Sequence, residues 1–183
     1  MKKSRVIWMA ALVMLLLAGC GQNATETPPQ PTTPVERPSG SNTDPSTTEP
    51  TLKKQMVTVY YSDNNVMELQ KEEQEITFAE DIEKYKKSLA LLETPVKPDV
   101  HIPLWKDFKY HSITFDKGTL TIDADSKNQF NMGSSGETMA LDALKNTFFQ
   151  YPEVKEIVFL EDGKKVETLM GHVDLSEPLK RDN

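Results

Sequence analysis

Few side chains in this sequence are of the types that commonly carry out chemistry. Cys20 is the only cysteine among the 183 residues, which excludes an internal disulfide and a multi-cysteine metal site. The three histidines, His101, His111 and His172, show no HExxH pattern and no short ligand spacing. Residues 133–136 read Gly-Ser-Ser-Gly, which lacks the spacing of a G-x-S-x-G nucleophile elbow. We therefore expect no catalytic residue, no metal and no cofactor.

The acidic residues also lack the spacing of a known type of site. Asp123 and Asp125 follow Asp116, but the D-x-D-x-D-G series of a calcium-binding loop is absent from the sequence. We expect solvated turn carboxylates at these positions, with a weak Ca²⁺ contact as the alternative. Ser134 and Glu137 fit a helix capping box, in which each side chain accepts a hydrogen bond from the backbone N–H of the other residue.

The first twenty residues combine basic residues at positions 2, 3 and 5 with an apolar run over 6–17. As a helix this run would span about 18 Å, against about 30 Å for the hydrocarbon core of a membrane. It is followed by Leu17-Ala18-Gly19-Cys20, which resembles the bacterial lipobox at all four positions. The resemblance implies cleavage between Gly19 and Cys20 and attachment of a lipid to the Cys20 thiol. Residues 1–19 are then a lipoprotein signal peptide, and the cell membrane holds the protein by its lipid on the extracytoplasmic face.

Residues 20–55 have the composition of a disordered linker that begins with the lipidated cysteine. The segment 21–55 contains seven of the twelve prolines, is otherwise mostly threonine, serine, asparagine and glutamine, and has no aromatic residue. A random coil of this length spans roughly 33 Å. The net charge of the whole chain is −7, and most acidic residues follow residue 55, which disfavours nucleic acid and anionic lipid as partners.

Residues 56–183 alternate between strand and helix patterns and form the predicted folded domain. The last segment, 171–181, is expected to be irregular. The pattern predicts an α+β fold in which two helices pack on one face of a mixed sheet. The predicted elements are strands 56–61 and 75–78, a helix over 80–92, a loop over 93–108, a hairpin of 110–115 and 119–123 around a three-residue loop, a helix over 134–150, and a hairpin of 154–160 and 164–168 around Asp162-Gly163.

Several of these pieces together resemble the GerMN domain of spore-germination proteins. The resemblance implies a fold like that of ring-building domains, and a role in binding and assembly at the cell envelope, in sporulation or germination. It supplies no catalytic residues. The residues that carry it are Val57-Thr58-Val59-Tyr60-Tyr61, Ala90-Leu91-Leu92-Glu93-Thr94-Pro95, Ile102-Pro103, the hairpin Ile113–Asp123, and the late blocks Ala143–Lys155 and Asp162-Gly163-Lys164.

The sequence therefore predicts a lipid-anchored, non-catalytic interaction module that binds envelope proteins or a second copy of itself. The alternatives are a lipid-anchored enzyme that acts on the cell wall, or a ligand-binding envelope protein. A wall enzyme needs a nucleophile–base pair or convergent carboxylates, and no such spacing is present. Tyr60, Tyr61, Trp105 and Phe149 are the aromatic candidates for a binding patch, with core packing as the other interpretation.

Overall fold

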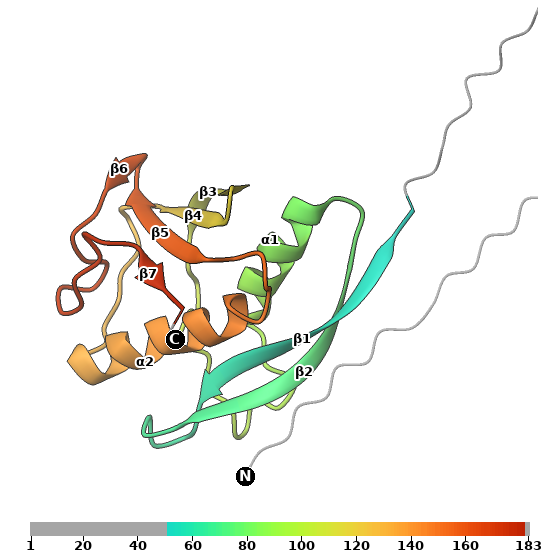
Figure 1. Cartoon of the computed structure of the whole chain (residues 1–183). Coiled ribbons are helices and arrows are strands. Elements are labelled where there is room, and N and C mark those ends of the chain that lie inside the picture. The colour runs from blue at the N-terminus through green and yellow to red at the C-terminus, as the bar shows by residue number, and fades with distance from the viewer. Residues whose placement is uncertain (1–50, 182–183) are drawn as a thin grey trace, which may run out of the picture. The chain divides into compact units, whose positions relative to one another are not determined.

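The computed structural model describes residues 51–181 (Figure 1). The predicted signal peptide, Gly19, Cys20 and most of the predicted linker lie outside the described residues. Within the described range, no helix is both long enough and apolar enough to cross a membrane. The elements are β1 (Lys53–Ser62), β2 (Leu69–Phe78), α1 (Asp81–Leu91), β3 (Tyr110–Asp116), β4 (Thr119–Ala124), α2 (Ser134–Phe148), β5 (Glu156–Glu161), β6 (Lys164–Lys165) and β7 (Leu179–Lys180).

Strands β1 and β2 form a long antiparallel hairpin that is a sheet of its own. β1 begins before the Met56 start expected from the sequence, because Lys53 already pairs with Phe78 at the end of β2. β2 begins at Leu69, well before the predicted strand 75–78. Its first half is rich in glutamine, lysine and glutamate, which are uncommon in strands. Pairing with β1 overrides that composition.

The other strands form a mixed sheet in the order β3-β4-β5-β6, and β7 pairs with β5. β4 and β5 are parallel, whereas the remaining pairs are antiparallel. The turn between β3 and β4 is Lys117-Gly118, one residue shorter than predicted, because Asp116 pairs with Thr119. This turn and Asp162-Gly163 have positive φ at both residues, as a type I′ turn requires. The predicted α+β class with a mixed sheet is confirmed.

Helices α1 and α2 lie between the mixed sheet and the β1–β2 hairpin (Figure 1). At the start of α1, the Glu83 carboxylate accepts hydrogen bonds from the backbone N–H groups of Ala79 (2.7 Å) and Glu80 (3.3 Å). At the start of α2 no side chain caps the helix, so the predicted capping box of Ser134 and Glu137 is wrong. The Glu137 carboxylate is buried and binds the C-terminal part of the chain instead.

The core lies where the helices meet the two sheets, and the loop before β3 contributes to it. Trp105 and Phe108 fold back onto the core, and both are buried. The indole N–H of Trp105 donates to the Ala140 carbonyl at 2.8 Å, and its ring stacks on Phe159 with centroids 6.0 Å apart. The hydroxyl of Tyr61 in β1 donates to the carbonyl of Leu91 at the end of α1, at 2.6 Å. These contacts fix the hairpin, helices and sheet as one unit.

Candidate functional site

The predicted site residues do not come together in the described part of the chain. Cys20 and Gly19 lie outside it, so lipidation and cleavage stay predictions. The three histidines lie beside three different carboxylates: His101 is buried, His111 is half-exposed, and His172 lies near α2. The sequence could not pair the histidines with their carboxylates, because each pair joins distant segments.

His111, Asp125 and Asp162 bring possible metal-ligand atoms within 4.8 Å of one another. His111 Nε2 lies 2.8 Å from Asp162 Oδ1, and the Ser126 hydroxyl donates to Asp162 Oδ2 at 2.6 Å. Asp162 therefore stands between the hydroxyl and the imidazole. A Ser-His-Asp triad needs the imidazole in the middle, so this order is not that of a triad. The contacts tie the β5–β6 turn to β3 and to the connection after β4.

The electrostatics of this cluster follow from its hydrogen bonds. The Ser126 hydroxyl, followed by His111, lowers the pKa of Asp162 to about 2. The Asp162 carboxylate in turn raises the pKa of His111. Asp123 and Asp125 each accept a backbone N–H at 2.8 Å, which is the behaviour of turn carboxylates. The carboxylates of this cluster therefore already accept hydrogen bonds from donors within the chain.

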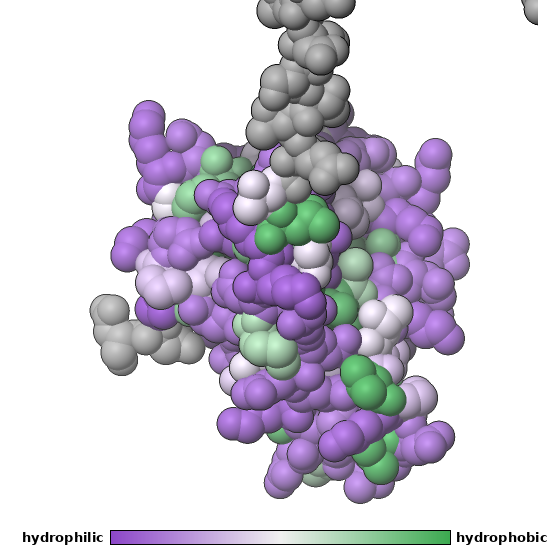
Figure 2. Space-filling view, turned by 90° about the vertical axis from the view of Figure 1, so that its right-hand side faces the viewer, coloured by the Kyte–Doolittle hydropathy of each residue, from purple (hydrophilic) through white to green (hydrophobic). Residues whose placement is uncertain are grey.

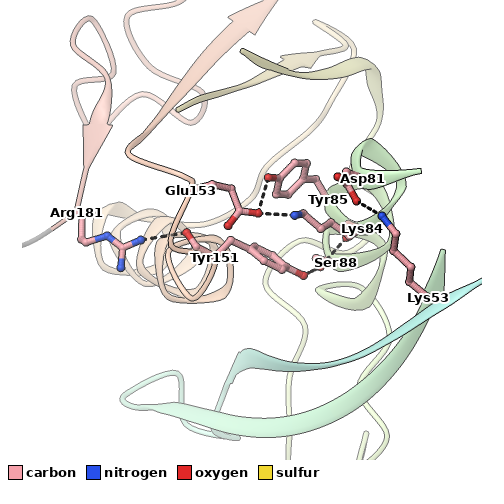
Figure 3. Close-up of polar contacts among 8 residues, drawn as sticks. All are labelled: Lys53, Asp81, Lys84, Tyr85, Ser88, Tyr151, Glu153 and Arg181. Carbon is pink, nitrogen blue, oxygen red and sulfur yellow. Dashed lines mark hydrogen bonds and ion pairs between the residues drawn. The ribbon is translucent and has the colours of Figure 1, made fainter. Parts of the chain in front are cut away.

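A second polar cluster joins α1 to the chain between α2 and β5 (Figure 3). Lys84 forms an ion pair with Glu153, and the Tyr85 hydroxyl donates to the same carboxylate at 2.9 Å. The hydroxyls of Ser88 and Tyr151 lie 2.6 Å apart. The Lys84 ammonium also lies 4.9 Å from the centre of the Tyr85 ring. Lysine, tyrosine and serine side chains in contact are a combination that can carry out proton transfer.

The protonation states in this second cluster argue against catalysis. Burial, followed by the hydrogen bond to Glu153, raises the pKa of Tyr85, and burial raises that of Tyr151. Burial would also raise the pKa of Glu153, but hydrogen bonds from Lys84 and Tyr85 hold it below its usual value. Both tyrosines are therefore neutral and Glu153 is ionised near neutral pH. The cluster is a stable ion pair with hydrogen-bonded hydroxyls.

The aromatic candidates do not form an exposed patch. Tyr61 and Trp105 are buried, and Tyr60 and Phe149 are partly buried against the core. The Arg181 side chain lies over the Phe149 ring, 5.5 Å from its centre. The exposed large apolar side chains of the described residues are instead aliphatic, and sequence reasoning missed them: Leu52, Met56, Val66, Met67, Val96 and Val100.

Four of these six side chains belong to two neighbouring segments, and we call Val66, Met67, Val96 and Val100 the tip patch. The first two lie in the β1–β2 turn, and the last two in the loop after α1. The segments are joined by two backbone hydrogen bonds between Ser62 and Ile102, at 2.8 and 3.0 Å. The Asn64 amide also donates to the Asp99 carbonyl at 3.1 Å.

A groove of about 470 Å³ lies beside the β1–β2 turn. Met67 and Leu69 line it from the hairpin, and Met139 lines it from α2. Polar side chains of α2, including Ser134 and Asp142, form the rest of its wall. In the sequence, the apolar pair Val66-Met67 within an otherwise polar turn is the one feature that points to this exposed surface. An exposed apolar cluster with polar neighbours is the usual surface of a protein-binding site.

The described residues therefore form a small α+β module whose titratable clusters join its elements to one another. Residues 58–167 match the model of the Germane family, which is described as "Sporulation and spore germination". The match extends over more than half of the 183 residues, so the chain belongs to the Germane family and contains a GerMN-type domain. No curated protein matches the chain.

Solved structures share this fold. A candidate lipoprotein from Clostridium perfringens is 22% identical over 71% of this chain and 88% of its own, with a TM-score of 0.51. The first GerMN domain of the sporulation protein GerM from Bacillus subtilis is 18% identical over 69% of this chain and 98% of its own, with a TM-score of 0.53. The tandem GerMN domains of GerM give 20% identity over 70% of this chain and 46% of that one, with a TM-score of 0.49.

Proposed function

We propose that this protein is an extracytoplasmic lipoprotein of the cell membrane whose GerMN-type domain binds a protein partner and catalyses no reaction. Cys20 carries the lipid, the segment up to β1 is the tether, and the domain serves sporulation or germination. Three findings support the proposal: the lipobox, the membership in the Germane family, and the likeness to a candidate lipoprotein.

The proposal that the domain catalyses no reaction is supported mainly by the hydrogen bonds and ion pairs within its two polar clusters. Lys84 and Glu153 neutralise each other, and Asp162 separates Ser126 from His111. The possible nucleophiles and bases in these clusters are thus held by hydrogen bonds or ion pairs to neighbouring side chains. A wall-degrading enzyme needs such a group free beside a cleft.

Lipid attachment is tested by following labelled palmitate in cells that produce the full-length chain. Cys20→Ala should carry no label and should leave the membrane fraction, because the apolar run over 6–17 is too short to anchor it alone. Gly21→Ala, outside the lipobox, is the matched control and should be labelled like the wild type. Label on the Cys20→Ala chain would refute the anchor.

The absence of catalysis is tested with the unlipidated chain from Cys20 onward and purified peptidoglycan. No soluble fragments should be released during a long incubation. Fragment release that disappears in Glu153→Gln or Asp162→Asn would establish an enzyme and overturn this part of the proposal.

A further inference from the structure

The β1–β2 turn holds its apolar side chains in a fixed position. The Asp63 carboxylate accepts hydrogen bonds from the backbone N–H groups of Met67 (2.7 Å) and Glu68 (3.1 Å). The Asp63 N–H donates to the Glu68 carbonyl at 2.9 Å, which closes the turn. Met67 is 75% exposed although its backbone is held in this way. An ordered backbone under an exposed methionine lowers the entropy cost of binding.

Val66 has an unusual conformation for its residue type. Its φ is +55°, in the left-handed region that β-branched residues rarely adopt. Such strained positions are concentrated at functional sites. Glycine or asparagine at this position would relieve the strain, and valine instead adds an exposed apolar side chain next to Met67. At this turn the sequence therefore has residues suited to contact with another molecule in place of residues that would stabilise the turn itself.

The charges around the tip patch indicate what kind of partner it fits. Asp63, Glu68 and Asp99 lie in the turn and the adjoining loop, against one lysine, Lys97. A second copy of the chain would bring the same acidic groups to the contact, and an anionic bilayer would repel them. A protein pocket with lysine or arginine at its edge complements both the apolar side chains and the charge.

The tip patch also lies away from the point where residues 1–50 join the domain. β1 contains ten residues and therefore spans about 30 Å from Lys53 to the turn. Figure 1 shows the two ends of β1 at opposite sides of the domain. The face that carries the start of β1 and α1 is mainly hydrophilic, with small separate apolar groups (Figure 2). The tip patch therefore lies at the end of the hairpin opposite the start of β1.

From these observations we infer that the tip patch inserts into an apolar pocket rimmed by lysine or arginine on a partner protein. Val66 and Met67 of the turn enter the pocket, Val96 and Val100 of the adjoining loop contact its wall, and Glu68 and Asp99 meet the basic rim. The inference rests on the proposed partner-binding role and gives that role a location and a partner chemistry.

The first test selects peptides from a random displayed library on the unlipidated chain from Cys20 onward, attached to a support through that single cysteine. Selected peptides should combine aliphatic or aromatic residues with lysine or arginine. Met67→Ser should weaken their binding about tenfold or more, and added salt should weaken it further. Met56→Ser changes an exposed methionine near the other end of β1 and should leave binding unchanged. Circular dichroism should show both variants folded.

The outcomes separate this inference from the proposed function. Binding that is unaffected by Met67→Ser, or peptides that are acidic or insensitive to salt, would overturn the tip patch and leave a binding role elsewhere on the domain. A selection that yields no binder would contradict both.

The second test places a photo-crosslinking amino acid at position 67 of the lipidated chain in cells, with position 117 in the β3–β4 turn as control. Capture at position 67 alone of a protein with a basic-rimmed apolar pocket is expected. Adducts only to lipid or to a second copy, or no adduct at all, would overturn the inference.

Discussion

Glu137 is fully buried, and three donors from one later segment converge on its carboxylate. These are the Thr168 hydroxyl at 3.2 Å and the backbone N–H groups of Met170 at 3.2 Å and His172 at 2.8 Å. We expect Glu137→Ala to reduce the free energy of unfolding by about 2–4 kcal/mol, because it leaves these donors without an acceptor and opens a cavity. Glu137→Gln should cost less, since its amide oxygen still accepts. Urea unfolding followed by circular dichroism measures both.

Ser134→Ala is the control for that experiment, because Ser134 begins the same helix but caps nothing. It should change the free energy of unfolding by less than about 0.5 kcal/mol. A loss of about 1 kcal/mol, the usual value of a serine cap, would mean that the capping box forms in solution.

The His111–Asp162 pair makes a prediction about pH. The Asp162 carboxylate raises the pKa of His111 in the folded chain, so the pair stabilises the fold fully below the unfolded histidine pKa of about 6.5. This contribution is lost as pH rises through the folded pKa. Asp162→Asn should lower the His111 pKa toward 6.5, as followed by the imidazole proton shifts in NMR. An unchanged His111 pKa would show that the pair does not form in solution.

At the scale of elements, the two type I′ turns differ in what surrounds their glycines. Gly118 has a φ of +98°, and a Cβ added there would lie 2.8 Å from Lys155 Cγ. Gly163 has a φ of +77° and no atom within 4 Å of an added Cβ. Gly163→Ala should therefore cost only the backbone strain of about 1–2 kcal/mol, and Gly118→Ala should cost more. Chemical unfolding of the two variants decides this, and equal losses would show that the Lys155 side chain moves aside without cost.

The elements that could be predicted from the sequence are those whose signal is local. The apolar face of α2, the alternation in β4 and the Asp162-Gly163 turn are visible in the sequence because each needs only neighbouring residues. β7 could not be predicted, because a strand of two residues has no pattern of its own and is held by partners far away in the sequence. It pairs with β5, and the adjoining Arg181 donates to the carbonyls of Tyr151 and Val154. The tip patch was missed for the same reason, since the bond between Asn64 and Asp99 joins two separate loops.

At the scale of the whole molecule, the domain closes one of its own free strand edges. Side chains at the end of α2 and just after it pair with the outer edge of β1. Gln150 both donates to the Thr58 carbonyl and accepts from its N–H, each at 2.9 Å. The Thr147 hydroxyl accepts from the Tyr60 N–H at 3.4 Å, and Ile102 pairs with Ser62 farther along. An occupied edge resists addition of another strand. Partner binding through side chains at the tip patch fits this closed edge better than strand addition at β1.

Residues 51–181 should form the independently folding unit of this chain. A fragment of residues 51–181 should unfold cooperatively, with a melting temperature within a few degrees of the chain from Cys20 onward, because it contains every described element. A fragment that begins at Met56 removes Lys53–Gln55, whose partners are Ile76–Phe78 at the end of β2. The exposed ion pair of Lys53 and Asp81 contributes little, so the loss comes from the strand pairing that covers buried Ile76 and Phe78.

Loss of these pairings should lower the melting temperature of the shorter fragment by about 4 °C for each 1 kcal/mol removed. Thermal unfolding followed by circular dichroism compares the three proteins under one condition. Equal melting temperatures for the two fragments would place the start of the folded unit at Met56, as the sequence alone suggested. Non-cooperative unfolding of the 51–181 fragment would mean instead that residues before 51 stabilise the domain, and the tether would then need a structural role of its own.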